Sequence, residues 1–458
     1  MSAEWQATTL GRICEAQGGA IQTGPFGSQL HTSDYKATGV PVVMPTNIGD
    51  GGIVEDGIAR IGQSDVDRLS QHTLRMGDIV FSRRGDVTKN ALIRPREVGW
   101  FCGTGCLKVR LGNESIATAQ FISHCLRLPG IKEWLTRHAV GATMPNLNTG
   151  ILSAVPIHLP PLQTQHEIAG MLNALDDRIT LLRETNATLE AIAQALFKSW
   201  FVDFDPVHAK QQGRAPEGMD EATAALFPDS FEESELGLVP RGWRVGSLQE
   251  CCKRVESGGT PKRTVPEYWN GPVSWLTSGE VRSPIVFSTK ETITELGMKE
   301  SSAKLWPVGT TVIAMYGATA GEVCLLAEPT TANQACCGLI PAPNLRTFLF
   351  LYARRERENL ASKSSGSAQQ NLNKGLVANH PVIIPSGDVL ISYESVAGAL
   401  LESWAENERQ AQTLATLRDT LLPRLISGQL RLPEAVAELP AMQAALNGVL
   451  QQCIPASQ

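Results

Sequence analysis

Residues 162–201 are the stretch that most constrains what this chain can fold into. They contain no proline and one glycine, and their apolar side chains recur three and four residues apart. That spacing places the side chains in a stripe along one face of a helix, and the charged residues, Asp176 among them, fall mostly off the stripe. The stripe consists of Ile168, Leu172, Leu175, Ile179, Leu182, Asn186, Leu189, Leu196 and Trp200. At ~1.5 Å per residue the helix would be about 60 Å long. A single amphipathic helix cannot bury its own stripe, so the sequence predicts a partner helix.

An internal duplication supplies that partner. Residues Gly141, Asn146, Leu147, Asn148, Gly150, Pro156 and Pro160 recur 225 positions later as Gly366, Asn371, Leu372, Asn373, Gly375, Pro381 and Pro385. The same offset predicts a second long helix at about 389–426, with a stripe at Leu400, Asn407, Leu414, Leu421 and Leu425. Chance similarity between two amphipathic helices is the alternative, but the identical residues upstream of each helix argue against it. Each copy is therefore expected to end in a long helix.

The second stripe is weaker than the first. Arg418 and Ala411 occupy stripe positions, and Pro423 removes one backbone hydrogen bond near the helix end. If the helices align antiparallel at their centres, Asn186 and Asn407 would meet and hydrogen-bond. A buried asparagine fixes the register of coiled coils in this way.

The remaining sequence predicts two α/β units. At 458 residues the chain should hold two or three domains. Short apolar runs at 40–45, 78–82 and 107–111 indicate strands, and 117–128 and 131–139 indicate helices separated by Pro129-Gly130. The run at 77–85 (GDIVFSRRG) realigns on 309–317 (GTTVIAMYG), an offset of 232.

The predicted fold class is therefore α/β (α+β), with two similar globular domains, two long antiparallel helices forming a coiled-coil-like spacer, and an internal pseudo-two-fold duplication. The expected segments are a first domain at 1–158, a first spacer helix at 159–201, an acidic linker lying over the surface at 202–241, a second domain at 242–385, a second spacer helix at 386–428 and a C-terminal tail at 429–458.

Charge and cysteine content narrow the class of protein. The net charge of −6 argues mildly against nucleic acid, but residues 201–240 carry nine acidic and two basic residues, which leaves the rest nearly neutral. Any DNA binding must therefore draw on local loops or on a basic partner. The ten cysteines include no CxxC pair, and their spacing does not suggest zinc. We expect reduced, buried thiols in a cytoplasmic protein, with no signal peptide and no membrane-spanning run.

Signatures of catalysis are missing from the sequence. It has no Walker-type loop, GxGxxG, HExxH or GxSxG. The sequence Asp205-Pro206-Val207 is the nearest approach to a DNA methyltransferase tetrapeptide, and it lacks the second proline. We therefore favour a protein without catalysis, cofactor or metal of its own. A coiled-coil scaffold with protein-binding heads and a solitary enzyme with an unrecognised site remain the alternatives.

Several loops carry side chains suited to DNA. Arg83 and Arg84 stand beside a predicted turn, with Lys89 and Asn90 close behind. Arginine can bind a guanine edge with two hydrogen bonds, and asparagine can do so with adenine. A solvated hairpin tip is the alternative interpretation.

Two glycine-rich loops occupy similar places in the two copies and suit close approach of the backbone to phosphate, although plain turns explain them nearly as well. Their candidate residues are Thr23 and Phe26 in the first copy, and Thr260, Lys262 and Arg263 in the second. Tyr316, Asn333 and Gln334 are weaker candidates. The repeated asparagines, by contrast, are expected to fix the chain where it enters each long helix. They are Asn146, Asn148, Asn371 and Asn373.

Together these segments resemble the specificity subunits of type I restriction–modification systems, over nearly the whole chain. PPLQTQHEIAGMLNALDDRI at 160–179 looks like the family's first helical region, and LRDTLLPRLISGQL at 417–430 looks like its C-terminal region. SGGTPKRTVPEYWNGPVSWLTSGEV at 257–281 is similar to the opening of many target-recognition domains, and 200–243 is also typical. The chain departs from the pattern at 386–406, which lacks a Pro-Pro-Leu-x-x-Gln opening, so contacts there are expected to differ from those of the first copy.

The resemblance implies a division of labour. Each α/β unit would be a target-recognition domain that reads one half of a split site on double-stranded DNA, and the helices would hold the domains apart. Methylation would come from two modification subunits that bind S-adenosylmethionine. Cleavage and translocation would come from restriction subunits that use ATP and Mg²⁺. The duplication independently predicts two reading heads at fixed spacing, much as dimeric repressors place two chains on two half-sites. Because the heads differ in sequence, the site should be bipartite and non-palindromic.

Overall fold

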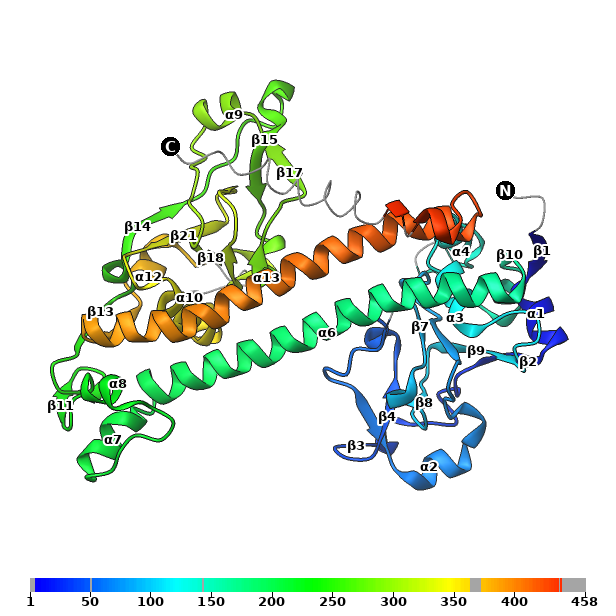
Figure 1. The fold of residues 1–458 in the computed structure, drawn as a ribbon, viewed down its shortest axis with the longest axis horizontal. Coiled ribbons are helices and arrows are strands. Elements are labelled where there is room, and N and C mark those ends of the chain that lie inside the picture. The colour runs from blue at the N-terminus through cyan, green and yellow to red at the C-terminus, as the bar shows by residue number, and fades with distance from the viewer. Residues whose placement is uncertain (1–4, 50–51, 142–143, 363–371, 436, 439–458) are drawn as a thin grey trace. The chain divides into compact units, whose positions relative to one another are not determined.

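The computed structural model describes residues 5–49, 52–141, 144–362, 372–435 and 437–438. The chain forms two compact units (Figure 1). Unit 1 comprises Met1–Arg178 with Leu414–Gln443, and unit 2 comprises Ile179–Thr413 with Ala444–Gln458. Asn371 and most of the expected tail at 429–458 lie outside the described residues.

Unit 1 is built on two four-stranded sheets. The first has the order β2-β9-β6-β7, with all neighbours antiparallel. The second has the order β3-β5-β4-β8, in which β4 and β8 are parallel, and β1 pairs separately with β10. The strands are β1 (Gln6–Thr9), β2 (Gly18–Thr23), β3 (Tyr35–Lys36), β4 (Val40–Val43), β5 (Ala59–Ile61), β6 (Ile79–Ser82), β7 (Asn90–Leu92), β8 (Phe101–Cys102), β9 (Cys106–Gly112) and β10 (Pro156–Leu159).

The helices of unit 1 have caps that the sequence supplies. α3 begins after Thr118, whose hydroxyl accepts a hydrogen bond from the Phe121 amide at 3.2 Å. The sequence predicts that Pro129 lies between two helices. In the structure Pro129 is instead the first residue of α4, a position that needs no amide hydrogen. The helices are α1 (Leu10–Ala16), α2 (Gln63–Arg68), α3 (Ala119–Cys125), α4 (Pro129–His138) and α5 (Thr149–Ser153), with short 3₁₀ turns η1 (Thr32–Asp34), η2 (Pro45–Asn47), η3 (Ser70–His72) and η4 (Pro95–Glu97).

Unit 2 repeats most of the strand order of unit 1, because β14-β21-β18-β19 matches β2-β9-β6-β7 and β17-β15-β20 matches β5-β4-β8. Its larger sheet runs β14-β21-β18-β19-β16, and its smaller sheet runs β17-β15-β20 with β15 and β20 parallel. β13 pairs with β22 as β1 pairs with β10. The strands are β11 (Phe231–Ser234), β12 (Gly237–Pro240), β13 (Arg244–Ser247), β14 (Cys252–Ser257), β15 (Trp269–Leu276), β16 (Ile285–Val286), β17 (Glu291–Ile293), β18 (Thr311–Ala314), β19 (Val323–Leu326), β20 (Thr331–Ala332), β21 (Cys336–Pro341) and β22 (Pro381–Ile384). β18 lies 232 positions after β6, so the predicted duplication is confirmed.

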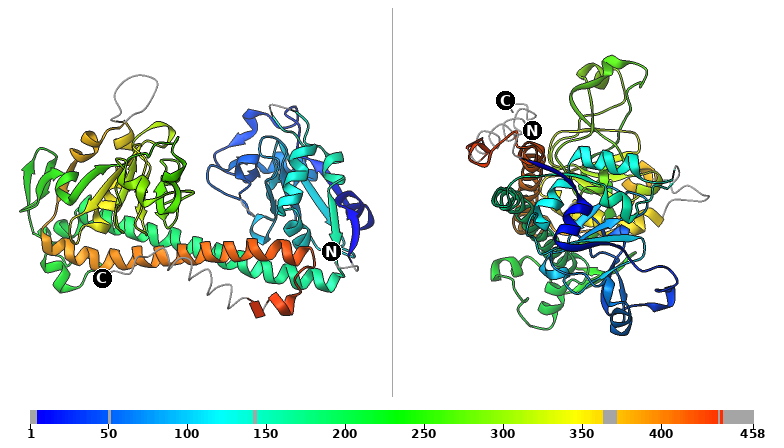
Figure 2. Two further views of the ribbon diagram at one scale, coloured as in Figure 1. Left: turned by 90° about the horizontal axis from the view of Figure 1, so that it is seen from above. Right: turned by 90° about the vertical axis from the view of Figure 1, so that its right-hand side faces the viewer.

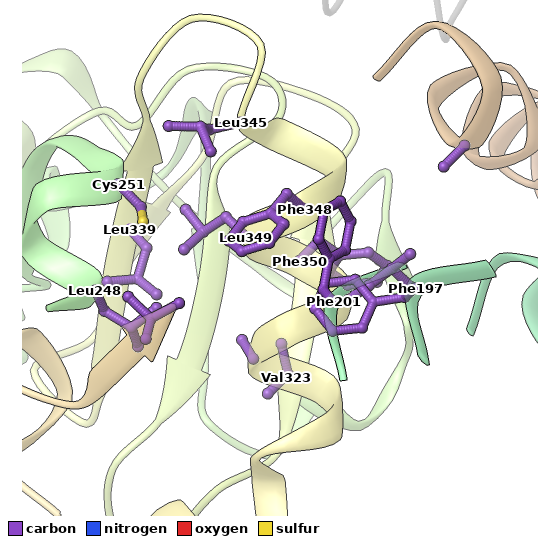
Figure 3. Packing of buried hydrophobic residues seen from close by; sticks show 14 of the residues in the cluster. Phe197, Phe201, Leu248, Cys251, Val323, Leu339, Leu345, Phe348, Leu349 and Phe350 are labelled. Atoms are coloured by element: carbon purple, nitrogen blue, oxygen red, sulfur yellow. The ribbon is translucent and has the colours of Figure 1, made fainter. Parts of the chain in front are cut away.

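Aromatic residues at the end of the first long helix enter the core of unit 2, which also contains several shorter helices. The shorter helices are α7 (Asp205–Gln211), α8 (Glu221–Ala225), α9 (Glu295–Lys299), α10 (Arg346–Arg355), α11 (Arg357–Ser362) and α12 (Lys374–Ala378), with 3₁₀ turns η5 (Leu248–Cys251), η6 (Pro266–Tyr268), η7 (Glu280–Arg282) and η8 (Gly317–Thr319). Phe197 and Phe201 pack against Phe348 and Phe350 of α10 in the largest core cluster of this unit (Figure 3). Burial of these rings fixes the end of the first long helix in unit 2.

Both predicted long helices are present: α6 (Leu162–Phe201) and α13 (Gly387–Ile426). Their segments lie side by side within each unit (Figure 2). In unit 2 the pair is antiparallel, because Asn186 faces Glu408 whereas Trp200, further along α6, packs on Tyr393 near the start of α13. The predicted stripes are buried at Ile168, Leu172, Ile179, Leu182, Asn186, Trp200, Leu421 and Leu425, and half-buried at Leu175, Leu189, Leu196, Leu400, Asn407 and Leu414.

The helix pair corrects two predictions about polar residues. Asn186 does not pair with Asn407: its side-chain amide nitrogen lies 3.5 Å from Glu408 Oε2, and its buried Oδ1 has no partner within the described structure. Arg418 is not a weak point of the stripe. It is buried and donates to Asp176 Oδ1 at 2.8 Å, so the carboxylate expected off the stripe lies inside the interface.

The acidic segment after α6 is folded and only partly a surface linker. Phe204, Val207 and Phe227 are buried in the same cluster as Trp243. Lys210 donates to the Ala224 carbonyl at 3.1 Å, which ties α7 to α8. The acidic composition of this segment suggested a surface linker. In the structure the acidic residues do stay on the surface, but a few apolar residues of the same segment enter the core.

Two of the repeated asparagines, Asn148 and Asn373, cap short helices and not the long helices at whose entry they were predicted to act. Asn148 accepts from the Ile151 amide at 2.8 Å and caps α5, and Asn373 accepts from the Leu376 amide at 2.9 Å and caps α12. Each short helix leads into β10 or β22, and those strands lead into α6 or α13. The asparagine effect predicted for the long helices therefore acts two elements earlier.

The described cysteines are free thiols, and all but Cys252 are buried. Burial raises the pKa of Cys251 to about 11 and that of Cys102 to about 12, which keeps these thiols protonated and unreactive near neutral pH. Among the helices that the structure describes, none combines the length and apolarity needed to cross a membrane.

Candidate nucleic-acid interface

In unit 1, three loops meet at one end of the sheet β2-β9-β6-β7. Thr23 at the end of β2 lies opposite Leu107, and Ser82 at the end of β6 lies opposite Cys106, the first residue of β9. Since β9 is antiparallel to both neighbours, the chain leaves β2 and β6 where it enters β9. The structure therefore brings together the two segments that the sequence singled out, one after Thr23 and one after Ser82.

The side chains in these two loops differ in freedom. Phe26 is 58% exposed, and Arg84 is exposed. Arg83 is half-buried and donates from Nε to Asn146 Oδ1 at 3.3 Å. Thr23 is half-buried at the strand end. Phe26 and Arg84 are thus free to contact a ligand, whereas Arg83 helps to hold the loop.

The turn between β6 and β7 is braced by its own polar groups. Asp86 Oδ1 accepts from both the amide and the hydroxyl of Thr88, at 3.1 and 2.7 Å. Lys89 is exposed. Asn90 is only 5% exposed, and its amide nitrogen donates to the Thr88 carbonyl at 3.2 Å. In this arrangement Asn90 does not present its amide to a base edge, contrary to the sequence interpretation.

Unit 2 places the equivalent loops at the equivalent end of its sheet. β14 ends at Ser257 opposite Cys337, and β18 ends at Ala314 opposite Cys336, where β21 begins. Beyond β18, the Met315 amide donates to the Ala335 carbonyl at 2.7 Å. The loops after β14, after β18 and before β21 therefore meet, as the matching loops do in unit 1.

These loops hold most of the remaining candidates. The Thr260 hydroxyl donates to Gln334 Oε1, so two of the predicted residues are in contact. Tyr316 is 40% exposed and stands 232 positions after Arg84, at the same point beyond the strand. Asn333 Oδ1 accepts from the Ala335 amide at 3.1 Å, which makes it a turn-forming residue.

Arg263 is held in place by its neighbours. Its guanidinium carbon lies 3.9 Å from the centre of the Trp269 ring and 4.8 Å from that of Trp275. Nη2 donates to Glu291 Oε2 at 2.9 Å, and this hydrogen bond raises the pKa of Arg263. Lys262 is exposed, and its carbonyl accepts from Trp269 Nε1 at 3.2 Å. Arg263 therefore shapes the loop, and Lys262 points a free cation outward from it.

The comparisons with known proteins show the family to which the chain belongs. A family model described as "Type I restriction modification DNA specificity domain" matches residues 2–191 and 240–389, one stretch in each repeat. The chain belongs to this family. The two repeats are accordingly DNA specificity domains.

Specificity subunits are the relatives found. The type I restriction enzyme HindI specificity subunit of Haemophilus influenzae is 25% identical over 412 residues, covering 80% of this chain and 89% of that protein. The MjaIX specificity subunit of Methanocaldococcus jannaschii is 25% identical over 322 residues, covering 69% and 70%. A crystal structure of a type I restriction–modification system S subunit from M. genitalium matches with a TM-score of 0.54 at 16% identity, covering 92% of this chain and 96% of that one. This likeness supports the fold.

In this specificity-domain protein, sequence reasoning missed residues of two kinds. Trp269 and Glu291 hold Arg263 and lie on strands whose sequences have no charge pattern that marks a binding site. The Trp-rich run at 269–275 was the signal that could have pointed to this contact. Exposed apolar side chains on the long helices were missed because they lie off the stripe. They are Leu181, Ile192, Ile391 and Val396, which are 49% to 52% exposed.

Proposed function

We propose that this chain is the DNA-reading subunit of a type I restriction–modification complex and that each repeat reads one half of a bipartite, non-palindromic site on double-stranded DNA. The observation that carries the proposal is the repetition of one loop arrangement with different side chains. Arg84 in the first repeat and Tyr316 in the second stand at equivalent points beyond equivalent strands. The same frame therefore presents different chemistry to each half-site.

The exposed groups suit both kinds of contact that a DNA reader needs. A guanidinium such as that of Arg84 can donate two hydrogen bonds to a guanine edge. Exposed lysines such as Lys89 and Lys262 can neutralise phosphate, which positions the protein without reading sequence. An exposed ring such as that of Phe26 can contact a thymine methyl group.

Catalysis would reside in other subunits of the complex. We infer that two modification subunits supply the methyltransferase with its S-adenosylmethionine, and that restriction subunits supply ATP- and Mg²⁺-dependent translocation and cleavage. The lack of methyltransferase and nucleotide-binding motifs in this chain supports that division.

The long helices would set the gap between the half-sites and dock the modification subunits. Four exposed apolar side chains favour α6 and α13 as the docking surface, because such groups gain stability when a partner covers them. These are Leu181, Ile192, Ile391 and Val396. The predicted stripe faces the neighbouring helix and the core, so it leaves these outer residues for a partner.

Selection of DNA from a random pool by the chain together with its modification subunit tests the function. A bipartite consensus with a fixed gap is expected. Binding without sequence preference would favour a scaffold with protein-binding heads, and chemical turnover by the chain alone would favour a solitary enzyme.

Exchange of residues 1–158 for the same segment of a relative assigns the half-sites. Only one half of the consensus should change, because the second repeat keeps its own loops. The reciprocal exchange of residues 242–385 is the matched control and should change the other half. A change in both halves after either exchange would show that the repeats do not read independently.

A further inference from the structure

Each repeat has a small hollow at the same place, beside the strand that follows the candidate reading turn. In unit 1 it measures about 200 Å³ and takes in Asn90, the first residue of β7. In unit 2 it measures about 220 Å³ and takes in Val323, the first residue of β19. The two strands occupy equivalent places in the two sheets, so the hollows are related by the duplication.

The same arginine lines both hollows. Arg127 follows α3 and Arg354 lies in α10, each at the same spacing from the residue that caps its helix, Thr118 or Leu345. In both cases the guanidinium is anchored to α6: Arg127 Nη1 donates to Asp176 Oδ2 at 2.6 Å, and Arg354 Nη2 donates to Glu190. The anchored arginine is thus a common feature of the duplicated hollow.

The two hollows differ in their other charges. In unit 2, Arg357 pairs with Glu322 across the hollow at 3.1 Å, and Arg355 pairs with Glu356 at 2.9 Å. Glu358 adds a further carboxylate to the lining. The cations of this hollow are therefore neutralised by the protein itself.

In unit 1 the hollow keeps its positive charge. Besides Arg127 it is lined by Lys89 and Lys132, and neither ammonium group has an ion-pair or hydrogen-bond partner among the residues that the structure describes. Asp86 is the one carboxylate among its described lining residues, and its Oδ1 already accepts two hydrogen bonds from Thr88. Two ammonium groups without such partners therefore line the same hollow as the buried guanidinium of Arg127.

We propose that the hollow of the first repeat binds a phosphate group of the DNA backbone and that its counterpart in the second repeat does not. This inference rests on the proposed function. The turn that carries Lys89 also carries Arg84, so a phosphate held by Lys89 and Lys132 would lie next to the bases that Arg84 can reach. The contact would fix the register of the first repeat on the duplex and carry no sequence preference of its own.

The salt dependence of binding tests the proposal. Each phosphate that the protein neutralises makes the plot of log affinity against log salt steeper by about 0.9. In complex with the modification subunit and on the selected duplex, the Lys89→Gln, Lys132→Gln double variant should therefore flatten the slope by about 0.9, and each single variant by no more than that. The double variant should shrink the affinity loss between 50 and 200 mM salt by about three- to fourfold. The preferred sequence should not change.

A matched control lies in the other hollow. Arg357→Gln combined with Glu322→Gln removes one ion pair without changing net charge, and it should leave the salt slope unchanged. Ethylation of single DNA phosphates gives a second readout. Ethylation at one backbone position beside the half-site of the first repeat should weaken DNA binding by the wild-type complex, whereas binding by the lysine double variant should not change. Unchanged melting temperatures would show that the variants are folded.

The outcomes separate this inference from the function on which it rests. If the wild-type complex selects no bipartite site, the proposed function fails. If it does select one, but the double variant keeps the full slope and the same ethylation pattern, only the phosphate site is wrong. Equal flattening by the control pair would show that the hollows do not differ, which also overturns the proposal.

Discussion

Asp176→Asn should destabilise unit 1 far more than is expected for a charged residue that the sequence places off the apolar stripe. The carboxylate accepts from Arg127 at 2.6 Å and from Arg418 at 2.8 Å. The side chains are 11%, 8% and 7% exposed, so all three charges are buried together. Removing one member of such a buried set strands charge in the interior and costs about 3–5 kcal/mol. Arg418 keeps a contact with Asp419 at 2.8 Å, which favours the lower end of that range.

Asp177→Asn is the matched control on the neighbouring residue. Asp177 is 67% exposed and pairs with Arg94 at 3.1 Å on the surface, so its loss should cost less than ~1 kcal/mol. For a unit of about 200 residues, each kcal/mol moves the melting temperature by ~2–4 °C. Calorimetry should therefore show the unit 1 transition lowered by roughly 6–20 °C in Asp176→Asn and by a few degrees at most in the control. Equal shifts would refute the buried-charge argument.

The same site predicts an acid dependence. Burial alone would raise the pKa of Asp176, but Arg127 and Arg418 outweigh it and hold the pKa below the usual carboxyl value. A carboxyl with a depressed folded pKa contributes stability that is fully present above its unfolded value of ~3.9 and is lost as the pH falls through the folded pKa. Wild-type unit 1 should lose stability more steeply below about pH 4 than Asp176→Asn does. Parallel pH profiles would contradict this linkage.

Four further outcomes are expected. Arg84→Ala should weaken DNA binding by ~1–3 kcal/mol and relax preference at one base pair, as read by repeated selection; a uniform loss with a flatter salt slope would mean phosphate contact instead. Arg83→Ala should also lower the melting temperature, because its bond to Asn146 is lost. Asn186→Leu should stabilise unit 2 by ~1 kcal/mol in thermal unfolding, since it removes a buried oxygen without a partner. Insertion of one heptad near Asn186 and another near Ala411 adds about 10 Å of helix and should widen the gap by up to about three base pairs, which an unchanged gap on selected DNA would contradict.

Periodicity made the helices and the duplication predictable from sequence. The stripe from Ile168 to Trp200 and its copy obey a spacing that does not depend on neighbouring elements, and the helices begin and end within a few residues of expectation. Strands with continuous apolar runs, such as β6, were also found, because their side chains are all buried. The sequence offset between the two copies then predicted which strands of the second sheet correspond to those of the first.

The candidate site was only partly predictable, since side-chain orientation depends on contacts between distant residues. Sequence reasoning found Arg84 and Tyr316, but it could not tell that Asn90 turns inward or that Arg263 is held by Trp269 and Glu291. These partners lie on other strands, and their pairing follows from sheet register. The loops were identified, whereas the roles of the residues within them required the fold.

The polar residues of the helix seam show the limit most clearly. The stripe pattern places Asp176 off the stripe and treats Arg418 as a weak point in it, yet the two charges lie together in the interface with Arg127 from the domain. The second repeat keeps the equivalent arginine, Arg354, and pairs it with a different carboxylate, Glu190 of α6. An offset of 225 maps Asp176 onto Leu401 of α13, so the second repeat takes its acid from α6, the helix of the first copy. The duplication therefore preserved the arginine that ties each domain to a long helix but not the carboxylate that it meets. An offset that aligns identical residues cannot reveal a contact whose second partner lies in the other copy, so this tie became visible only when the side chains were placed.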